Sequence, residues 1–572
     1  MGSSGNEIWN VLVRHFDEEK VTKVVEALED ECIYRLDDIK DFTLAELRDL
    51  NVPAGMAKML LLEGRKEAAF TLRGSRVAYL GSEAYDRVMS RCPSDMANQM
   101  ITFTIQEQMS DTKPPALLNY RPDTARGLPI ALVSPVFAYF LDLCDSLELT
   151  PTAKDSAFVN ELCLKSSMAY VDEAKRCKML FALLRAYLPL EFLVDEVGKK
   201  DIAILYQRQL LAICQVKNEE GFSGNAYLEA GAYYVRDLSD NRDEVMVRCE
   251  RYPVFLLEIT GALLKVSGAA FASCPLVEPL KMGLLVRRTN HKEMDALCRM
   301  VVALRKSLLK LVSLRAAVMR RPAAELDLAA VDLPYPLQEF YSTGGGVMVL
   351  SFGKLYVLDL QHSRDVLPTP FEQIKRSGVT KILAKFCQRY GSQVHADWFS
   401  RGCTPKLFNT MRLSGDWLMV LMEYMEGYTD LQRKTNVFPV SSAKWNKISS
   451  LARKCLKDAQ ASTLRGVHGD LRLDNLLVDE GLTHVLAVDF ERAGIEGCDR
   501  YPFFMNHTDV EWPAGASDNQ LLMQVHDNEL LESQLERKHK RKYDWHNDRS
   551  FVPKKLAALA SGASVSDTEE DF

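Results

Sequence analysis

The sequence lacks a long apolar run. None of its stretches approaches the roughly 18 consecutive apolar residues that a membrane-spanning helix needs. Its beginning, MGSSGNEIWNVLVRHFDEEK, lacks the basic region and the continuous apolar region of a secretory signal peptide. We therefore expect no membrane partner, and a protein that works inside a cell, in the nucleus or the cytoplasm.

Paired cysteine motifs are also missing. The 13 cysteines are odd in number and scattered, and none form a CxxC pair. This usage argues against a disulfide framework and a zinc site, and it favours buried thiols in a reducing compartment. The net charge is 71 − 78 = −7, which argues against a nucleic-acid coat over the whole chain but permits local basic faces.

The composition is sufficient for several folded domains. The chain has 572 residues, of which 47% are hydrophobic and 26% charged. At roughly 150 residues per domain this length suggests three or four domains. Apolar residues at helical spacing predict a small helical bundle over residues 6–70, with Thr43 and Glu46 as a capping box.

The end of that first segment resembles a sterile alpha motif domain, through the run DFTLAELRDLNVPAGMAKMLLLEG. The resemblance implies an interaction domain and possible self-assembly through residues 6–70. A generic helical bundle is the alternative. Residues 71–154 are interpreted as a linker and helical region, because TKPPALLNYRPDTARGLP is rich in proline and turn residues.

The next part of the chain, residues 155–280, has an α/β character. Apolar spacing predicts helix over 155–188, DIAILY and QLLAICQV predict two strands joined by a tight turn, and AYLEAGAYYVRDL predicts a helix. Residues 281–329 form a basic connector. Its segment 287–321 holds ten Lys or Arg against two acids and carries an amphipathic helical stripe. That helix either packs with a solvated basic face or contacts DNA.

Residues 330–545 are predicted to form one further domain. Strand-like runs VMVLSF, LYVLDL, KILAKF and LMVLMEYM precede a helical segment, SAKWNKISSLARKCLKDA. The last residues, 546–572, are small, polar and acidic, so we expect a disordered tail. Before them, ERKHKRK is a short basic run of the kind that serves in nuclear import.

The strongest chemical signal lies in GVHGDLRLDNLLVDEGLTHVLAVDFERAG. Two strand-like runs bracket a turn at Asp479, with Asp470 and Asn475 before the first run and Asp489 after the second. Phosphoryl transfer from ATP needs one carboxylate that accepts the proton of the attacking hydroxyl. It also needs an amide and a second carboxylate that hold magnesium. A hairpin would bring these three side chains to one edge.

This stretch resembles the protein-kinase-like superfamily, closest to its HGD branch with aminoglycoside and choline phosphotransferases. The resemblance implies that Asp470 is the catalytic base, that Asn475 and Asp489 are metal ligands, and that Arg472 lies near the transferred phosphate. ATP and Mg²⁺ would be the cofactors. Upstream, Lys385 in ILAKFCQRYG stands where the lysine that holds the ATP phosphates is expected, and Glu423 and Tyr424 would lie near the adenine edge.

The chain departs from the kinase pattern at several places. It has no GxGxxG loop, Gly469 replaces the arginine of HRD, Phe490 is followed by Glu491, and no Ala-Pro-Glu segment is present. The helix expected after Lys385 offers Gln393 and Asp397 in place of a glutamate partner. A non-catalytic pseudokinase scaffold is therefore one alternative.

A second constellation lies in residues 155–280. Glu173 falls in a predicted helix, Asp201 opens a strand, and Gln215 and Lys217 end the next strand. Glu229 and Tyr233 share a face of the following helix. This order resembles the PD-(D/E)xK nuclease superfamily, although the neutral Gln215 replaces an acidic metal ligand. The resemblance implies metal-dependent cleavage of DNA as another alternative, with a regulatory kinase-like domain.

The two constellations in this order resemble Crinkler-type effector proteins, in which a nuclease-like module can precede a kinase-like module. The segments VDEAKRCKMLF, CTPKLF and RYPFFMNHTDVEWPAG carry this resemblance over roughly residues 155–545. It implies an effector or toxin that acts inside cells, in some cases inside a host cell. The family's N-terminal translocation motif is not found here.

The sequence thus predicts a multidomain α+β protein. It would contain a helical bundle, a nuclease-like α/β domain, a basic helical connector and a bilobal kinase-like domain. Its predicted activity is ATP- and magnesium-dependent phosphoryl transfer onto a Ser/Thr-type hydroxyl of a protein, or onto itself.

Overall fold

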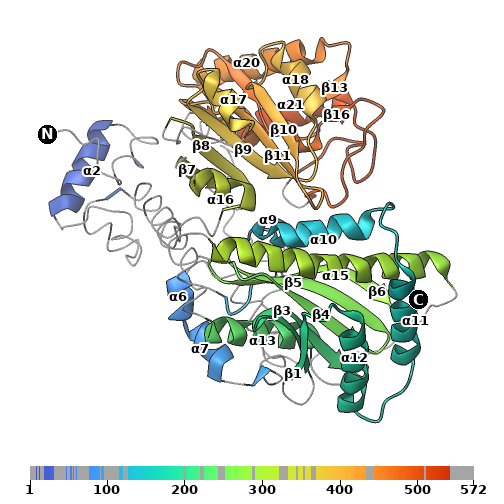
Figure 1. Ribbon diagram of the computed structural model, residues 1–572. Coiled ribbons are helices and arrows are strands. Elements are labelled where there is room, and N and C mark those ends of the chain that lie inside the picture. The colour runs from blue at the N-terminus through green and yellow to red at the C-terminus, as the bar shows by residue number, and fades with distance from the viewer. Residues whose placement is uncertain are drawn as a thin grey trace, which may run out of the picture. The chain divides into compact units, whose positions relative to one another are not determined.

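Figure 1 shows the computed structural model. The residues that the structure describes are 8, 12, 18–30, 47, 50, 52–53, 56, 60, 76–90, 92–93, 95, 115–119, 127–197, 201–219, 225–241, 251–285, 290–320, 333–342, 346–351, 354–361, 369–432, 443–507 and 510–540. The chain divides into two compact units. The first is Met1–Gln388 with Phe408–Tyr424, and the second is Arg389–Leu407 with Met425–Phe572. The protein is of mixed α/β class.

A six-stranded sheet dominates the first unit, with its strands in sequence order from β1 to β6. The strands are β1 (Leu193–Val197), β2 (Asp201–Tyr206), β3 (Gln209–Lys217), β4 (Val254–Thr260), β5 (Leu263–Phe271) and β6 (Pro275–Leu284). All neighbours are antiparallel except β3 and β4. Helix α13 (Ala226–Asp240) makes the crossover that a parallel pair requires.

Helices cover both faces of this sheet (Figure 1). Helix α13 packs on one face, where it contacts β3 and β4. The other face carries α10 (Pro135–Asp145), α11 (Ala153–Ser166), α12 (Glu173–Tyr187) and the long α15 (His291–Met319). Phe137 and Phe140 of α10 pack edge-on against Phe255 of β4. The short helices α6 (Arg76–Leu80), α7 (Glu83–Ser90) and α9 (Ile130–Val133) add to the same core.

A second, antiparallel sheet of five strands has the order β10-β11-β9-β8-β7. Its strands are β7 (Gly346–Ser351), β8 (Leu355–Asp359), β9 (Lys381–Cys387), β10 (Leu407–Arg412) and β11 (Leu418–Glu423). Helices α16 (Tyr335–Ser342) and α17 (Phe371–Arg376) accompany it. Strand β9 is therefore the central strand, with its side chains largely buried.

The second unit is mainly helical around two small sheets. Its helices are α18 (Ser392–Phe399), α20 (Ala443–Gln460) and α21 (Gln524–Lys540). One sheet joins β12 (Tyr428–Asp430), β14 (Leu476–Asp479) and β15 (Val485–Ala487), and the other joins β13 (Gly466–Val467) and β16 (Gly494–Ile495). Two 3₁₀ turns, η3 (Leu473–Asn475) and η4 (Phe490–Arg492), follow β13 and β15 along the chain.

Many elements expected from the sequence are present. The β2–β3 hairpin turns at Gln207 and Arg208, which both have positive φ as a two-residue hairpin turn requires. The β7–β8 and β14–β15 hairpins, α13, α15 and α20 also form as predicted. The expected helix over 155–188 is two helices, α11 and α12, because an Asp172 cap starts a new helix after a short break.

The proline-rich segment, predicted to be a linker or long loop, is partly paired. Leu118 forms a parallel bridge with Leu276 of β6, through Leu118 N to Pro275 O at 2.9 Å and Val277 N to Leu118 O at 2.9 Å. A bridge to an edge strand needs only a few extended residues, which a proline-rich run can supply.

Part of the N-terminal prediction can be compared with the structure. Helix α2 (Glu18–Asp30) buries Val21, Val24, Val25 and Leu28 on one face, as their helical spacing predicts. The capping box at Thr43 and Glu46 and the acidic tail at 546–572 lie outside the described residues. Within the parts of the chain that are described, no helix is long and apolar enough to cross a membrane.

Candidate functional site

The HGD motif forms a loop between β13 and η3 in the second unit. Gly469 has φ +75°, and a Cβ there would lie 2.7 Å from the carbonyl oxygen of Arg492. Only glycine accepts both this left-handed backbone and this close approach. The local backbone geometry therefore explains why residue 469 is a glycine, independently of any family pattern.

A buried aspartate anchors this loop. The carboxylate of Asp527 on α21 accepts hydrogen bonds from His468 N at 2.6 Å and from Gly469 N at 2.9 Å. Burial raises the pKa of Asp527 to about 7, and the nearby charge of Asp470 adds to the shift. The two bonds fix the backbone directly before Asp470. The sequence prediction missed Asp527, because no local pattern connects it to a motif 57 residues earlier.

The proposed base, Asp470, is held by two arginines. Arg472 donates to it with Nε at 2.6 Å and Nη2 at 3.2 Å, and Arg492 Nη1 lies 3.5 Å from Oδ2. Burial opposes the charged form of Arg472, but its bonds and charge contacts with Asp470, together with Asp474 and Asp489, outweigh this, so the pKa of Arg472 is raised. Two guanidinium groups therefore lie against the carboxylate of the proposed base.

The two predicted metal ligands are tied to the same loop. Asn475 Nδ2 donates to the Asp470 carbonyl at 2.8 Å, and Val488 N donates to the Asn475 carbonyl at 2.9 Å. Asp489 follows directly and has a left-handed backbone, with φ 71° and ψ 67°. Hydrogen bonds thus join Asp470, Arg472 and Asn475, and Asp489 directly follows Val488, which is bonded to Asn475.

These residues suit magnesium. The amide nitrogen of Asn475 donates to the Asp470 carbonyl, so the amide oxygen points away from that bond. Asp489 supplies a carboxylate. Oxygen ligands from one or two side chains, completed by phosphates and water, are how proteins hold Mg²⁺ on a nucleotide. Among the described residues no group of three or more His, Cys, Asp or Glu forms a dedicated metal site.

An aromatic stack packs around Phe490, the residue that follows Asp489. The ring of Phe490 stacks on His395 at 4.7 Å and lies 4.8 Å from His468. Burial lowers the pKa of His395 to about 4, so its ring is neutral. Its Nε2 donates to the Pro405 carbonyl at 2.8 Å, and Tyr390 donates to its Nδ1 at 2.7 Å. This packing fixes the turn that carries Asp489 and Arg492.

The predicted nucleotide residues lie in the first unit. Lys385 is on the central strand β9, in register with Val420 and Leu355, and is only 8% exposed. Glu423 ends β11 and Tyr424 follows it, both half-buried. Asp397, considered as a partner for Lys385, belongs to the second unit, where it accepts a hydrogen bond from Ser462 at 2.8 Å.

Three of the predicted nuclease-like residues, Gln215, Lys217 and Glu229, are buried, whereas Glu173 and Tyr233 are half-buried. Lys217 Nζ lies 2.7 Å from Glu229 Oε2 of α13, and the two side chains are 6% and 2% exposed. Gln215 is fully buried, and neither atom of its amide group has a hydrogen-bond partner. Asp201 pairs in register with Gln215. Tyr233 lies one turn beyond Glu229 on α13, and Glu173 opens α12.

The sequence prediction missed Glu258 near these residues. It lies on β4 in register with Gln215, it is buried, and it accepts a hydrogen bond from Ser267 at 3.0 Å. Only the parallel β3–β4 pairing places it there. The Lys217 side chain is thus paired with a buried acid and shielded from solvent.

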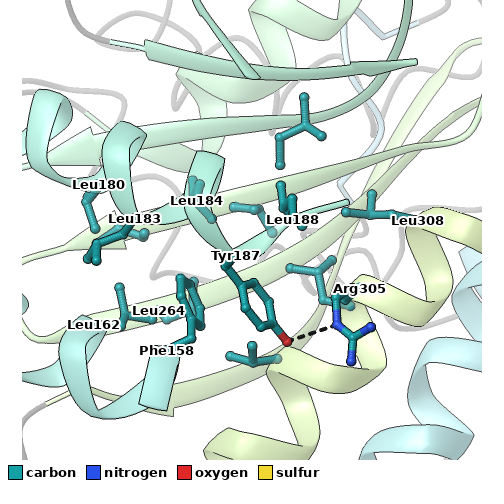
Figure 2. Close-up of a pocket in the computed structure, with 15 residues that line it drawn as sticks. Phe158, Leu162, Leu180, Leu183, Leu184, Tyr187, Leu188, Leu264, Arg305 and Leu308 are labelled. Carbon is teal, nitrogen blue, oxygen red and sulfur yellow. Dashed lines mark hydrogen bonds between the residues drawn. The ribbon is translucent and has the colours of Figure 1, made fainter. Parts of the chain in front are cut away.

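Figure 2 shows a small apolar cavity in the first unit, between the sheet and α11, α12 and α15. Its volume is about 40 Å³. Leucines line most of it, and Tyr187 and Arg305 lie at one side, where Arg305 Nε donates to the Tyr187 hydroxyl at 3.1 Å. A cavity of this size and polarity is a packing gap that stays dry, and it is not a substrate site.

Comparisons with known proteins do not assign the chain to a family. No protein-family model matches the chain, and no curated protein matches it. Among solved structures the chain is similar to a Cydia pomonella granulovirus kinase, PK-1, at 17% identity and a TM-score of 0.20. The match covers 28% of this chain, and the chain spans 56% of the length of that kinase. A TM-score this low does not identify a fold.

Proposed function

We propose that the protein is a phosphotransferase that moves the γ-phosphoryl group of ATP to a hydroxyl group of a protein, or of itself. Magnesium bound with the nucleotide supplies charge neutralisation for the transferred group. The observation that supports the proposal is the cluster of Asp470, Arg472, Asn475 and Asp489, anchored through the two Asp527 hydrogen bonds.

Each side chain has a separate task in this proposal. Asp470 accepts the proton of the attacking hydroxyl, and Arg472 moves its donors from Asp470 to the phosphoryl group. Asn475 and Asp489 would hold the magnesium ion. Lys385 would bind the ATP phosphates, and Glu423 and Tyr424 would border the adenine. Positioned carboxylates of this kind contribute roughly 10²–10⁴-fold to rates.

The test is ADP formation from ATP by the purified full chain in the presence of Mg²⁺. Asp489→Asn should abolish it, because an amide lacks the charge that holds the metal. Asp458→Asn is the control, since Asp458 is an exposed acid on α20 in the same unit. Equal ADP formation by wild type and Asp489→Asn would contradict the proposal.

The cellular setting is also a proposal. By its resemblance the chain would be a Crinkler-like effector or toxin inside a cell, in the nucleus or cytoplasm, with assembly through residues 6–70. The basic face of α15 is less available for DNA than its composition suggests. Arg305 is bound to Asp155 and Tyr187, and Arg315 donates to the Pro253 carbonyl.

We do not extend the proposal to nuclease activity. The Lys217–Glu229 ion pair is almost fully buried, so this lysine is not exposed for contact with a phosphodiester. A pseudokinase scaffold remains the alternative that the ADP measurement separates from a working enzyme.

A further inference from the structure

The segment after Asp489 carries a second arginine, Arg492, whose side chain lies near the proposed base Asp470. The turn η4 closes through Ala493 N to the Phe490 carbonyl at 3.3 Å, while the Phe490 ring is held in the aromatic stack. As a result the Arg492 side chain points back to Asp470, where its Nη1 lies 3.5 Å from Oδ2. The family pattern that predicts Asp470 and Asp489 does not predict this arginine.

An aromatic ring holds Arg492 in place. The guanidinium carbon lies 5.0 Å from the centre of the Trp512 ring, a cation–π contact. Trp512 is fixed in turn, because its Nε1 donates to the Asn506 carbonyl at 3.0 Å and its ring packs edge-on against Tyr501. Tyr501 and Trp512, both in the sequence segment RYPFFMNHTDVEWPAG, therefore support this arginine.

The Nη1 atom of Arg492 has no hydrogen bond, although it is buried. At 3.5 Å from Asp470 Oδ2 it makes a charge contact that is too long for a good hydrogen bond. Buried polar atoms without a partner are uncommon in folded proteins, and a catalytic role or a bound ion is among the explanations for them. This donor lies beside the proposed base.

The unpaired donor fits an anionic ligand. Arg472 contacts both Asp470 and Asp474, whereas Nη1 of Arg492 lies 3.5 Å from Asp470 Oδ2 without a hydrogen bond. A phosphoryl group in transfer bears negative charge on three oxygens, and it must pass close to the hydroxyl that Asp470 deprotonates. It is therefore a ligand that would satisfy the unpaired donor.

We propose that Arg492 is a catalytic residue, whose Nη1 donates to the phosphoryl group during transfer, and that Trp512 is a positioning residue. This inference rests on the proposed function. In the step, the bond between the γ-phosphorus and the bridging oxygen breaks and its electron pair leaves with ADP. The acceptor oxygen bonds to phosphorus, and its proton passes to Asp470. Arg492 stays protonated throughout.

The first measurement compares steady-state phosphoryl transfer by wild type, Arg492→Met, Arg492→Lys and Trp512→Leu. Loss of one charged donor to a transition state lowers kcat by about 10²–10³-fold. We expect this for Arg492→Met, with the KM for ATP nearly unchanged, partial recovery in Arg492→Lys, and an intermediate kcat for Trp512→Leu. Arg453→Met is the control, since Arg453 is ion-paired to Glu532 in the same unit.

The second measurement does not depend on turnover. Mg²⁺, ADP and aluminium fluoride together mimic the phosphoryl group in transfer, and stabilisation by the mimic is measured as a shift in Tm beyond that given by MgADP. Arg492→Met should keep the MgADP shift and lose the further shift, and its Tm without ligand shows whether it folds.

The outcomes separate the two proposals. Wild-type kcat in Arg492→Met, or an undiminished fluoride shift, overturns the role of Arg492 and leaves the phosphotransferase proposal standing. A wild type that transfers no phosphate, but shows a fluoride shift that Arg492→Met lacks, supports Arg492 as the phosphoryl-binding residue and refutes the proposed activity. A wild type with neither transfer nor shift overturns both.

Discussion

At the scale of single residues, the candidate site is built from positions whose local geometry leaves little choice. Gly469 lets the loop approach the Arg492 carbonyl, and Asp527 holds the loop from the opposite side. The hairpin between Asp470, Asn475 and Asp489 was predictable from its local turn signal, and the chemical roles of these residues stay predictions. Asp527 and Arg492 were not, because their roles depend on contacts made across the fold.

The first prediction concerns Gly469. Gly469→Ala combines a strained left-handed backbone with a clash against the Arg492 carbonyl. Such strain costs about 1–3 kcal/mol per residue. We expect a lowered Tm and a loss of phosphoryl transfer, because the loop before Asp470 must shift.

The matched control for this substitution is Gly497→Ala. Gly497 has a similar φ of +69°, but a Cβ there would have no atom within 4 Å. It should therefore show only the backbone cost and retain activity. Equal losses of Tm and activity in both variants would refute the role given to the Arg492 contact.

At the scale of elements, hairpins and long amphipathic helices followed from local patterns. The β2–β3 hairpin and α15 are examples, since the signals for both lie within the segment itself. The parallel β3–β4 pairing could not be predicted, because the sequence between two strands does not indicate which strands become neighbours in a sheet. That pairing places Glu258 beside Gln215. The bridge between Leu118 and Leu276 could not be predicted for the same reason.

The second prediction concerns the start of α11. Thr152 and Asp155 form a capping box, and Asp155 also accepts a hydrogen bond from Tyr187 and pairs with Arg305. Burial alone would raise the pKa of Asp155, but these bonds prevail and lower it to about 2 from 3.8. The charged form thus stabilises the fold, fully above the ordinary pKa and progressively less as the pH falls toward 2.

Asp155→Asn should therefore lower the free energy of unfolding at neutral pH by about 2 kcal/mol, the equivalent of that pKa shift. The measurement is urea unfolding of both proteins from about pH 7 down to about pH 3. The difference between them should be constant above about pH 5 and shrink below it, since the wild type alone then takes up the proton. A difference that does not depend on pH would contradict the assignment.

At the scale of the whole molecule, the chain forms two compact units whose boundary passes between Gln388 and Arg389, inside the region predicted as one kinase-like domain. The sequence predicted helices and strands in this region but did not show that α18, which follows Lys385, belongs with the HGD loop. Its His395 packs on Phe490 of η4, which lies 4.8 Å from His468 of the HGD loop, and this contact joins segments almost a hundred residues apart.

The central claim is that the protein transfers a phosphoryl group from ATP, with Asp470 as the base. Its most direct test is the transfer of label from γ-labelled ATP, with Mg²⁺, to the protein itself or to an added protein acceptor, by wild type, Asp470→Asn and Asp458→Asn. We expect label with wild type and Asp458→Asn, and at least about 10²-fold less with Asp470→Asn, which cannot accept the proton. Equal labelling by wild type and Asp470→Asn, or none by any of the three, would contradict the claim.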